Sequence, residues 1–481
     1  MKRRILIRVL ALLLGIIALS MIPSLILALV DQEAQSVKAF FYPLVVCTSG
    51  AVFALILGKS SNISFNTGDG FLLVSLAWFL TSILGSIPFI ITGVTTNPVD
   101  ALFESVSGFT TTGATIFADV EKLPRAILFW RSMTHWLGGM GIVVLTVALV
   151  PLLGVGGFQL LKAETPGPEK DKITPKITET AKILWFIYIG LTALEVLFLM
   201  IGGMNWFDAA NHAFATMATG GFGTKNISIA YYNSAWIDWV CTIFMILAGM
   251  NFSLYYRFLQ GKFQDLLKNT ELKVYLSIVI IASVLVAVVI LPQYGTLTEA
   301  LRFSSFQVAS IITTTGFATA DFDLWPAFAK TVLLVLMFIG GCSGSTGGGI
   351  KVVRHVVLFK QAGNEIRRLL HPRGVFSIQL NGRVGRKDVV YGVAGFVFLY
   401  LTLVFLVTLV VSSSGADLIS AFSSALVTVG NIGPGFGMIG PSQNYSGFPD
   451  YVKLVWSFAM IAGRLELWTV FILFTPEFWR R

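Results

Sequence analysis

Four short glycine-containing stretches, spaced about a hundred residues apart, constrain this chain more than any other feature. Each lies between apolar runs long enough to cross a membrane. The shared glycine is aligned as Gly113, Gly221, Gly316 and Gly430. In the second stretch Gly220 or Gly223 could take that place. Self-similar segments at a regular spacing indicate an internal repeat, so we expect four copies of one structural unit.

The residue types in these stretches suggest what the repeat is for. Backbone at membrane depth that is not helical needs protein or water to satisfy its N–H and C=O groups. Carbonyl oxygens left free in such backbone can replace the hydration shell of a cation, as in potassium selectivity filters. Glycine permits the dihedral angles that let consecutive carbonyls face one axis. We predict filter residues at Thr111, Thr112, Gly113, Thr219, Gly220, Gly221, Thr314, Thr315, Gly316, Thr428, Val429, Gly430 and Asn431.

The composition places the chain among polytopic membrane proteins. Hydrophobic residues make up 55% and charged residues 12%, and the mean hydropathy is +0.79. The net charge of +9 does not indicate nucleic acid, because the basic residues cluster between apolar spans. The three cysteines, Cys47, Cys241 and Cys342, lack the spacing of a disulfide framework or a metal site. No cofactor is expected.

The order of apolar and polar segments predicts the fold class. Two spans over Ile5–Val30 and Ala39–Leu57 form an N-terminal unit, residues 1–62. The repeats follow over 63–165, 166–260, 261–375 and 376–481. Each has a span, a short acid-capped helix that enters the membrane and ends at the glycine stretch, and a return span. We therefore predict an all-α polytopic membrane protein with ten spans and four pseudo-fourfold repeats around one pore.

The re-entrant helices are too short to span the bilayer. We expect them over Ala101–Gly108, Asp208–Met217, Glu299–Ser310 and Asp417–Leu426, with Asp100 as the first N-cap. Their C-terminal ends would present partial negative charge to a cation.

Lys and Arg residues predict the orientation. They gather before the first span, between repeats and at the C-terminal end, always on one side of the predicted membrane. By the positive-inside rule this side, with both termini, is cytoplasmic. The charged loops Glu164–Lys182 and Gln361–Arg386 are surface for a soluble partner, although topogenic charge explains them as well.

The filter motifs resemble a known superfamily. Those that match are Gly108-Phe109-Thr110-Thr111-Thr112-Gly113, Thr219-Gly220-Gly221-Phe222-Gly223, Thr313-Thr314-Thr315-Gly316-Phe317 and Thr428-Val429-Gly430-Asn431. Over nearly its whole length the chain resembles the bacterial TrkH/TrkG-type membrane subunits of the Trk/Ktr/HKT potassium transporters. Its two leading spans favour the Trk type over the Ktr type.

That resemblance carries expectations about ion, partners and location. It implies K⁺ as the transported ion, bound at the filter residues, since all four aligned positions are glycine. It also implies a homodimer in the bilayer of the bacterial cytoplasmic membrane, with one pore per chain. The resemblance also implies a cytosolic TrkA-type nucleotide-binding ring as the regulatory partner. This chain itself has no nucleotide motif.

A glycine cluster interrupts the return span of the third repeat. It consists of Gly344, Ser345, Thr346, Gly347, Gly348 and Gly349. Each glycine costs a helix about 1 kcal/mol relative to alanine, so the span should break here. The resemblance implies a loop that gates the pore below the filter. The alternative is close helix packing through small residues.

Arg464 is predicted near mid-membrane in the last span. An ionisable residue at that depth is costly and is functional by default. We predict a barrier beneath the filter, with a structural arginine satisfied by backbone carbonyls as the alternative. Arg131, His135 and Glu195 also lie near spans, and we interpret them as mainly structural.

The most consistent function is potassium uptake through a pore that is gated from the cytoplasm. A proton- or sodium-coupled symporter is the alternative, although the spans offer few buried acids besides Glu195 and Glu466. An enzyme is not expected, since the four histidines are scattered and neither H-E-x-x-H nor G-x-S-x-G occurs.

Overall fold

The computed structural model describes residues 2–56, 67–141, 177–381, 383–384 and 387–480. Within them, six helices are long and apolar enough to cross a membrane, or eight if two sharply bent helix pairs each count as one span. The other two predicted spans are the return spans of the first and third repeats. The end of the first of these, Trp130–Val150, and most of the loop Glu164–Lys182 lie outside the described residues.

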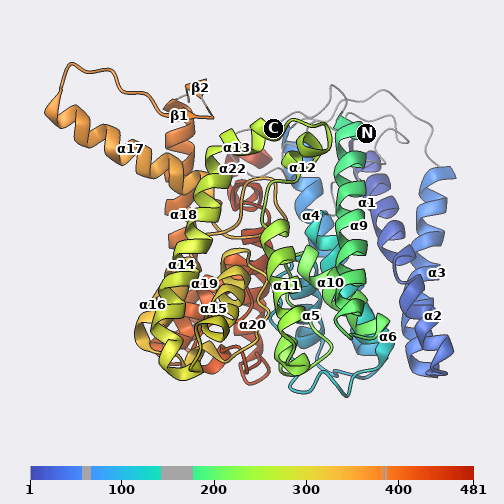
Figure 1. Cartoon of the computed structure of the whole chain (residues 1–481). Helices are drawn as coiled ribbons and strands as arrows, with labels where there is room; N and C mark the ends of the chain where they lie inside the picture. Colours follow the sequence, from blue (N-terminus) through green and yellow to red (C-terminus); the bar gives the residue numbers. More distant parts are fainter. Residues whose placement is uncertain (1, 57–66, 142–176, 382, 385–386, 481) are drawn as a thin grey trace.

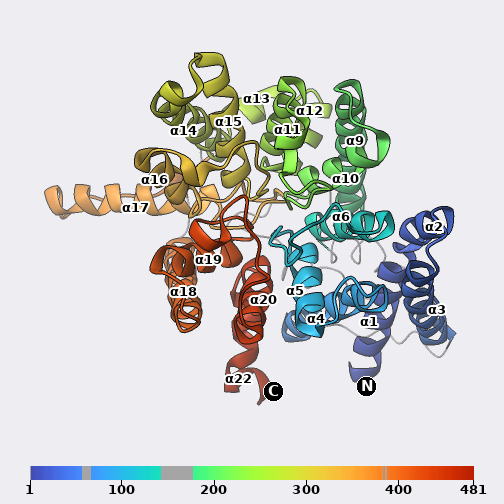
Figure 2. The same ribbon diagram turned by 90° about the horizontal axis from the view of Figure 1, so that it is seen from below.

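The four repeats surround a common centre (Figure 2). Each contributes an outer span, a shorter pore helix and a return helix. In chain order these are α4 (Thr67–Ile91), α5 (Pro98–Phe109) and α6 (Arg125–Gly139); α9 (Ile177–Ile201), α10 (Trp206–Met217) and α11 (Ala235–Ala248); α14 (Thr270–Tyr294), α15 (Leu297–Ile312) and α16 (Ala327–Leu336); and α18 (Lys387–Ser412), α19 (Leu418–Gly430) and α20 (Asp450–Arg464). The predicted all-α architecture is confirmed.

The remaining elements lie at the edge and at the ends of this bundle. The N-terminal helices stand at its edge and pack against the first repeat (Figure 2). They are α1 (Lys2–Leu19), α2 (Ile22–Val30) and α3 (Ala34–Ile56). The short elements are α12 (Phe252–Leu259), α13 (Phe263–Lys268), β1 (Gln379–Leu380), β2 (Arg383–Val384), α21 (Trp468–Phe471), α22 (Pro476–Trp479) and the 3₁₀ turns η2 (Ser228–Tyr232), η3 (Phe322–Leu324), η4 (Gly437–Ile439) and η5 (Ile472–Phe474). Strands β1 and β2 form an antiparallel hairpin.

Three pore helices begin earlier than predicted and the fourth begins one residue later, and the first three are not acid-capped. Side-chain oxygens of Asn97, Asn205 and Thr296 accept the first free backbone N–H groups, and Asp417 alone caps as an acid. The predicted cap Asp100 is wrong, since it lies inside the first turn of α5. A neutral amide or hydroxyl oxygen satisfies the same N–H groups, while acids in the first turn still complement the helix dipole.

The return spans break near one depth. Helices α11 and α12 meet at 94°, and α20 is bent by 110° from the segment Trp468–Phe474. In the third repeat, α16 ends at Leu336 and α17 (Val352–Leu370) begins only after a long loop. Helix α17 then projects sideways from the bundle (Figure 1). The return spans predicted for the second and fourth repeats are therefore present as sharply bent helix pairs.

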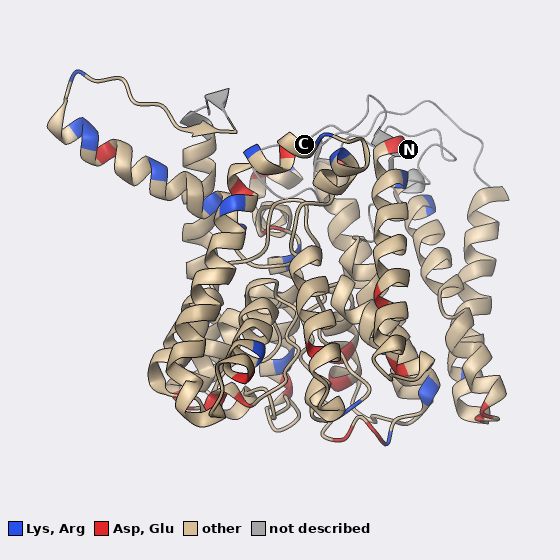
Figure 3. Cartoon of the chain, viewed as in Figure 1, with Lys and Arg blue, Asp and Glu red and all other residues tan. Residues whose placement is uncertain are grey.

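Charged residues gather toward the two ends of the bundle (Figure 3). The N- and C-termini lie at the same end of the bundle (Figure 1). This arrangement agrees with an even number of crossings between the termini.

Buried ion pairs tie neighbouring repeats together. Arg302 of α15 donates from Nε to Asp238 Oδ2 of α11 at 2.7 Å. Lys453 of α20 donates from Nζ to Asp100 Oδ1 of α5 at 2.6 Å, which joins the fourth repeat to the first. Removing one partner of such a pair leaves an uncompensated buried charge.

We expect Asp238→Ala to lower the free energy of unfolding by about 3 kcal/mol, because Arg302 would remain buried without its carboxylate. Thermal unfolding of the purified protein in detergent measures this. The double variant Asp238→Ala, Arg302→Met should recover most of the loss. Lys122→Ala, which breaks an exposed pair with Asp119, should not change the melting temperature; equal effects of both single variants would contradict the assignment.

Candidate functional site

All four pore helices end in the same unusual backbone conformation. Two residues in each stretch have positive φ, separated by one ordinary residue. The first of each pair is Thr111 (55°), Thr219 (56°), Thr314 (60°) and Asn431 (56°), and the second is Gly113 (81°), Gly221 (83°), Gly316 (82°) and Gly433 (97°). Left-handed backbone is rare for a β-branched residue such as threonine and marks a strained position.

Hydrogen bonds repeat the same pattern. The residue between the two left-handed positions donates its N–H to the carbonyl five residues earlier, which is typical of a helix end closed by a left-handed residue. These bonds join Thr112 to Ser107 at 2.9 Å, and Gly220 to Ala215, Thr315 to Ser310 and Ile432 to Val427 at 2.8 Å. The chain therefore leaves each helix at an equivalent place.

This geometry corrects the alignment of the fourth repeat. Gly430 is the last residue of α19, and Gly433 holds the position of the other three glycines. Thr428 and Val429, predicted as filter residues, are likewise helical. The local sequence favours Gly430, but Asn431 adopts left-handed backbone more readily than most residues and so ends the helix later. In the second repeat Gly221 holds the shared position.

The four glycines pack against one another in cyclic order. A Cβ on Gly113 would collide with the Gly220 carbonyl oxygen, and one on Gly221 with that of Thr315. The corresponding neighbours are the Ile432 oxygen for Gly316 and the Thr112 oxygen for Gly433. All four glycines line a single cavity. The four segments that follow the pore helices, which we call the strands although they are not β-strands, therefore close a ring around one axis. Each glycine leaves room for the carbonyl of the next repeat.

Side chains behind the ring hold the strands in place. The hydroxyls of Thr110 and Thr112 lie 2.8 Å apart, as do those of Thr313 and Thr315. Asn431 Nδ2 donates to Thr112 Oγ1 at 3.0 Å and links the fourth strand to the first.

His135 bridges the first and second strands. Its Nδ1 lies 2.7 Å from the Gly108 carbonyl oxygen, and the Phe222 N–H donates to its Nε2 at 3.1 Å. A carbonyl can only accept and an amide N–H can only donate. The ring is therefore neutral with its hydrogen on Nδ1.

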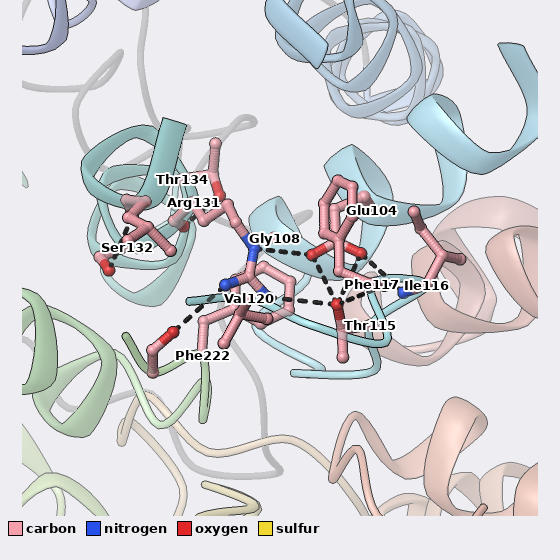
Figure 4. Close-up of polar contacts among 12 residues, drawn as sticks. Glu104, Gly108, Thr115, Ile116, Phe117, Val120, Arg131, Ser132, Thr134 and Phe222 are labelled. Atoms are coloured by element: carbon pink, nitrogen blue, oxygen red, sulfur yellow. Dashed lines mark hydrogen bonds and ion pairs between the residues drawn. The ribbon is translucent and has the colours of Figure 1, made fainter. Parts of the chain in front are cut away.

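Arg131 and Glu104 form a buried pair beside the cavity (Figure 4). Arg131 Nε lies 2.8 Å from Glu104 Oε1, and the guanidinium stacks 4.1 Å from the Phe222 ring centroid. Glu104 also accepts the Ile116 N–H at 2.9 Å, and Arg131 donates to the Gly223 carbonyl at 3.2 Å. These contacts join the segments that follow Gly113 and Gly221. They agree with the structural role predicted for Arg131.

The glycine cluster of the third repeat forms a loop beneath the ring. We call residues 337–351 the intramembrane loop. The Gly348 N–H donates to Thr314 Oγ1 at 2.7 Å, and the Phe252 N–H donates to the Gly344 carbonyl at 3.0 Å. A Cβ on Gly348 would meet the Gly430 carbonyl. The loop thus touches the second, third and fourth repeats directly below the strands.

Arg464 connects this loop to the first repeat. It donates to the Thr346 carbonyl at 2.7 Å, and to those of Gly138 at 2.8 Å and Gly139 at 3.1 Å. The guanidinium therefore spans from the loop to the broken end of α6. The carbonyl contacts of the structural alternative are therefore present, and the barrier role of Arg464 stays a prediction.

Three further charged residues near the loop have partners that the sequence did not predict. Lys351 Nζ donates to the Gly347 carbonyl, and Arg354 pairs with Glu466. Glu466 therefore has Arg354 as its ion-pair partner. These partners are distant in sequence or inside the loop itself, so no local pattern indicates them.

Comparison with known proteins identifies the family. The TrkH family model, described as a cation transport protein, matches residues 36–481. The chain belongs to the TrkH family. This family consists of transporters, not enzymes.

Individual TrkH relatives cover most or all of the chain. It is 42% identical to the Trk system potassium uptake protein TrkH of Halomonas elongata over the whole of both chains. It is 43% identical to the Trk system potassium uptake protein TrkH of Escherichia coli K12, with 86% of each chain covered. The crystal structure of the potassium transporter TrkH from Vibrio parahaemolyticus superposes with a TM-score of 0.88 at 36% identity and covers both chains fully.

The corrected register makes a direct prediction for this TrkH-family chain. Gly433→Ala should abolish most cation flux, because alanine strains left-handed backbone by about 1–2 kcal/mol and its Cβ would collide with the neighbouring strand. Gly430→Ala should have a much smaller effect, since Gly430 is helical and the nearest atoms to its Cβ would be side-chain atoms, Tyr400 Oη at 3.2 Å and Ile432 Cδ1 at 3.3 Å. Rubidium uptake at matched expression measures both, and the reverse order would contradict the register.

Proposed function

We propose that this chain takes up potassium across the bacterial cytoplasmic membrane through the four-strand ring. The ring of left-handed glycines, each packed against the carbonyl of the next repeat, carries this proposal. It is supported by relatives named as Trk system potassium uptake proteins. Reversal potentials of the purified, reconstituted protein in opposed potassium and sodium gradients test it.

The ion contacts follow from the backbone. A dehydrated K⁺ needs several oxygen ligands at once, which carbonyls converging on one axis supply. We assign these to the strands Thr111–Gly113, Thr219–Gly221, Thr314–Gly316 and Asn431–Gly433. The pore helices point their C-terminal ends toward the ring and add partial negative charge.

The intramembrane loop and Arg464 would close the path below the ring. The loop lies against the strands through Gly348 and Thr314, and Arg464 ties it to the first repeat. At about 6 Å and an effective dielectric constant of about 20, the guanidinium would repel a passing K⁺ by about 3 kcal/mol. Movement of the loop would remove the obstruction and the charge together.

The remaining assignments rest on the family resemblance. We propose a homodimer with one pore per chain, regulated by a cytosolic TrkA-type nucleotide-binding ring. The end of the bundle that carries both termini would face the cytoplasm, and the four glycines would open to the outside.

A proton- or sodium-coupled symporter is the second candidate. The observation that favours it is Glu195, an acid fully buried within α9. Two other buried acids, Glu104 and Asp238, pair with Arg131 and Arg302. A coupled carrier would show a reversal potential that shifts with the proton or sodium gradient, whereas a channel would follow potassium alone.

Gly113→Ser should narrow the discrimination between potassium and sodium. The added side chain would displace the Gly220 carbonyl in one quarter of the ring, while the other three keep their geometry. Relative permeability from reversal potentials measures this. Unchanged selectivity at equal expression would contradict the assignment of Gly113.

Substitutions at Arg464 separate the effect of its positive charge from the effect of its hydrogen bonds, which tether the loop to α6. Arg464→Ala removes both and should increase potassium flux without a partner by about tenfold, roughly a tenth of the full Coulomb estimate because water screens the charge. Arg464→Lys keeps the charge, but its single ammonium does not span the three carbonyls that the guanidinium contacts. Low flux in the lysine variant would identify the charge as the barrier, and leakage equal to alanine would identify the tether. Two stable variants with parental flux would remove Arg464 from the mechanism.

A further inference from the structure

Two backbone N–H groups on either side of the glycine cluster of the intramembrane loop meet on one carboxylate. Glu271 Oε1 accepts the N–H of Ser343 at 2.7 Å and that of Val353 at 3.0 Å. Glu271 is the second residue of α14 and is buried. Its two bonds bracket the whole glycine cluster from Gly344 to Gly349. One oxygen atom therefore fixes how far apart Ser343 and Val353 lie on the two sides of the glycine cluster.

This contact constrains a segment that has little stiffness of its own. Four of the six residues in the cluster are glycine, which loses more conformational freedom on ordering than any other residue. A carboxylate makes stronger hydrogen bonds to backbone N–H groups than a neutral acceptor does. Because the ends are held together, the loop between them stays against Thr314 of the filter strand.

The carboxylate lies directly beneath the β1–β2 hairpin. Asn381, in the turn of that hairpin, accepts the Thr270 N–H at 2.9 Å, one residue before Glu271. Glu271, Ser343, Leu380 and Asn381 line one small cleft. Lys360 of α17 donates to the Gln379 carbonyl at 2.6 Å and holds the hairpin in place. The hairpin thus contacts the start of α14 where the loop is fastened.

We propose that Glu271 is the latch of the intramembrane loop, a positioning residue that holds it closed, and that the β1–β2 hairpin is the element through which the latch is released. Displacing the hairpin frees the first turn of α14, and the carboxylate then withdraws from Ser343 and Val353. The proposal rests on the gating role assigned above to the loop.

The test uses the full chain, reconstituted without any partner, and two measurements. One is rubidium flux. The other is the alkylation rate of Cys342, which neighbours Ser343 and is only 1% exposed, in a Cys47→Ser, Cys241→Ala background. Glu271→Ala should raise both by about tenfold, a typical conformational coupling. Glu271→Gln keeps a carbonyl acceptor and should give a smaller rise. Glu179→Ala, in the first turn of α9, is the matched control and should change neither.

The outcomes separate the latch from the gate. Faster alkylation with parental flux would show that the loop is released without opening the path, which overturns both the gating role and this proposal. Parental values of both measurements in a folded Glu271→Ala protein would overturn the latch alone. If that variant does not fold, Glu271→Gln and Asn381→Ala replace it in the test. Parental rubidium flux and parental alkylation of Cys342 in both of these variants would overturn the proposal.

Discussion

The structure depends on one constraint, the need to satisfy backbone N–H and C=O groups where a helix stops inside a membrane. Each pore helix ends with a left-handed residue and an N–H that returns to the carbonyl five residues earlier. This leaves the following carbonyls free of helical bonds. In three repeats the left-handed residue is threonine, which costs about 1–2 kcal/mol of strain. The hydroxyl pairs behind the strands, such as Thr110 with Thr112, help to hold that conformation.

Charge is distributed differently on the two sides of the ring. On the side of the cavity, Arg131 is neutralised by Glu104, and the pair acts as a brace between segments. On the side of the intramembrane loop, Lys351 and Arg464 donate to loop carbonyls. Basic groups placed on loop carbonyls both satisfy the broken backbone and raise the electrostatic cost of a cation there. Structural support and control of passage can therefore come from the same side chains.

Much of this was predictable because the repeat is visible in the residues themselves. The glycines of the first three stretches, the re-entrant helices and the break at Gly344–Gly349 follow from composition and spacing. The position of the fourth glycine does not follow from them. Thr428-Val429-Gly430 resembles the motif, but the helix continues through these residues and ends at Asn431. The bends after Ala248 and Arg464 also lacked a signal, because one or two small residues equally suit close packing. Contacts such as Glu271 with Ser343 join residues 72 positions apart, and no local pattern encodes them.

The cyclic packing of the four glycines has a consequence for how such a pore can change. In an assembly of four identical subunits, one codon alters every quadrant at once. Here each quadrant is encoded separately, and its glycine contacts only the carbonyl of the next. The fourth strand already differs, with Asn431 and Ile432 where the first has two threonines. In the proposed pore, a substitution in one repeat would therefore alter one quarter of the ring and leave the other three quarters unchanged.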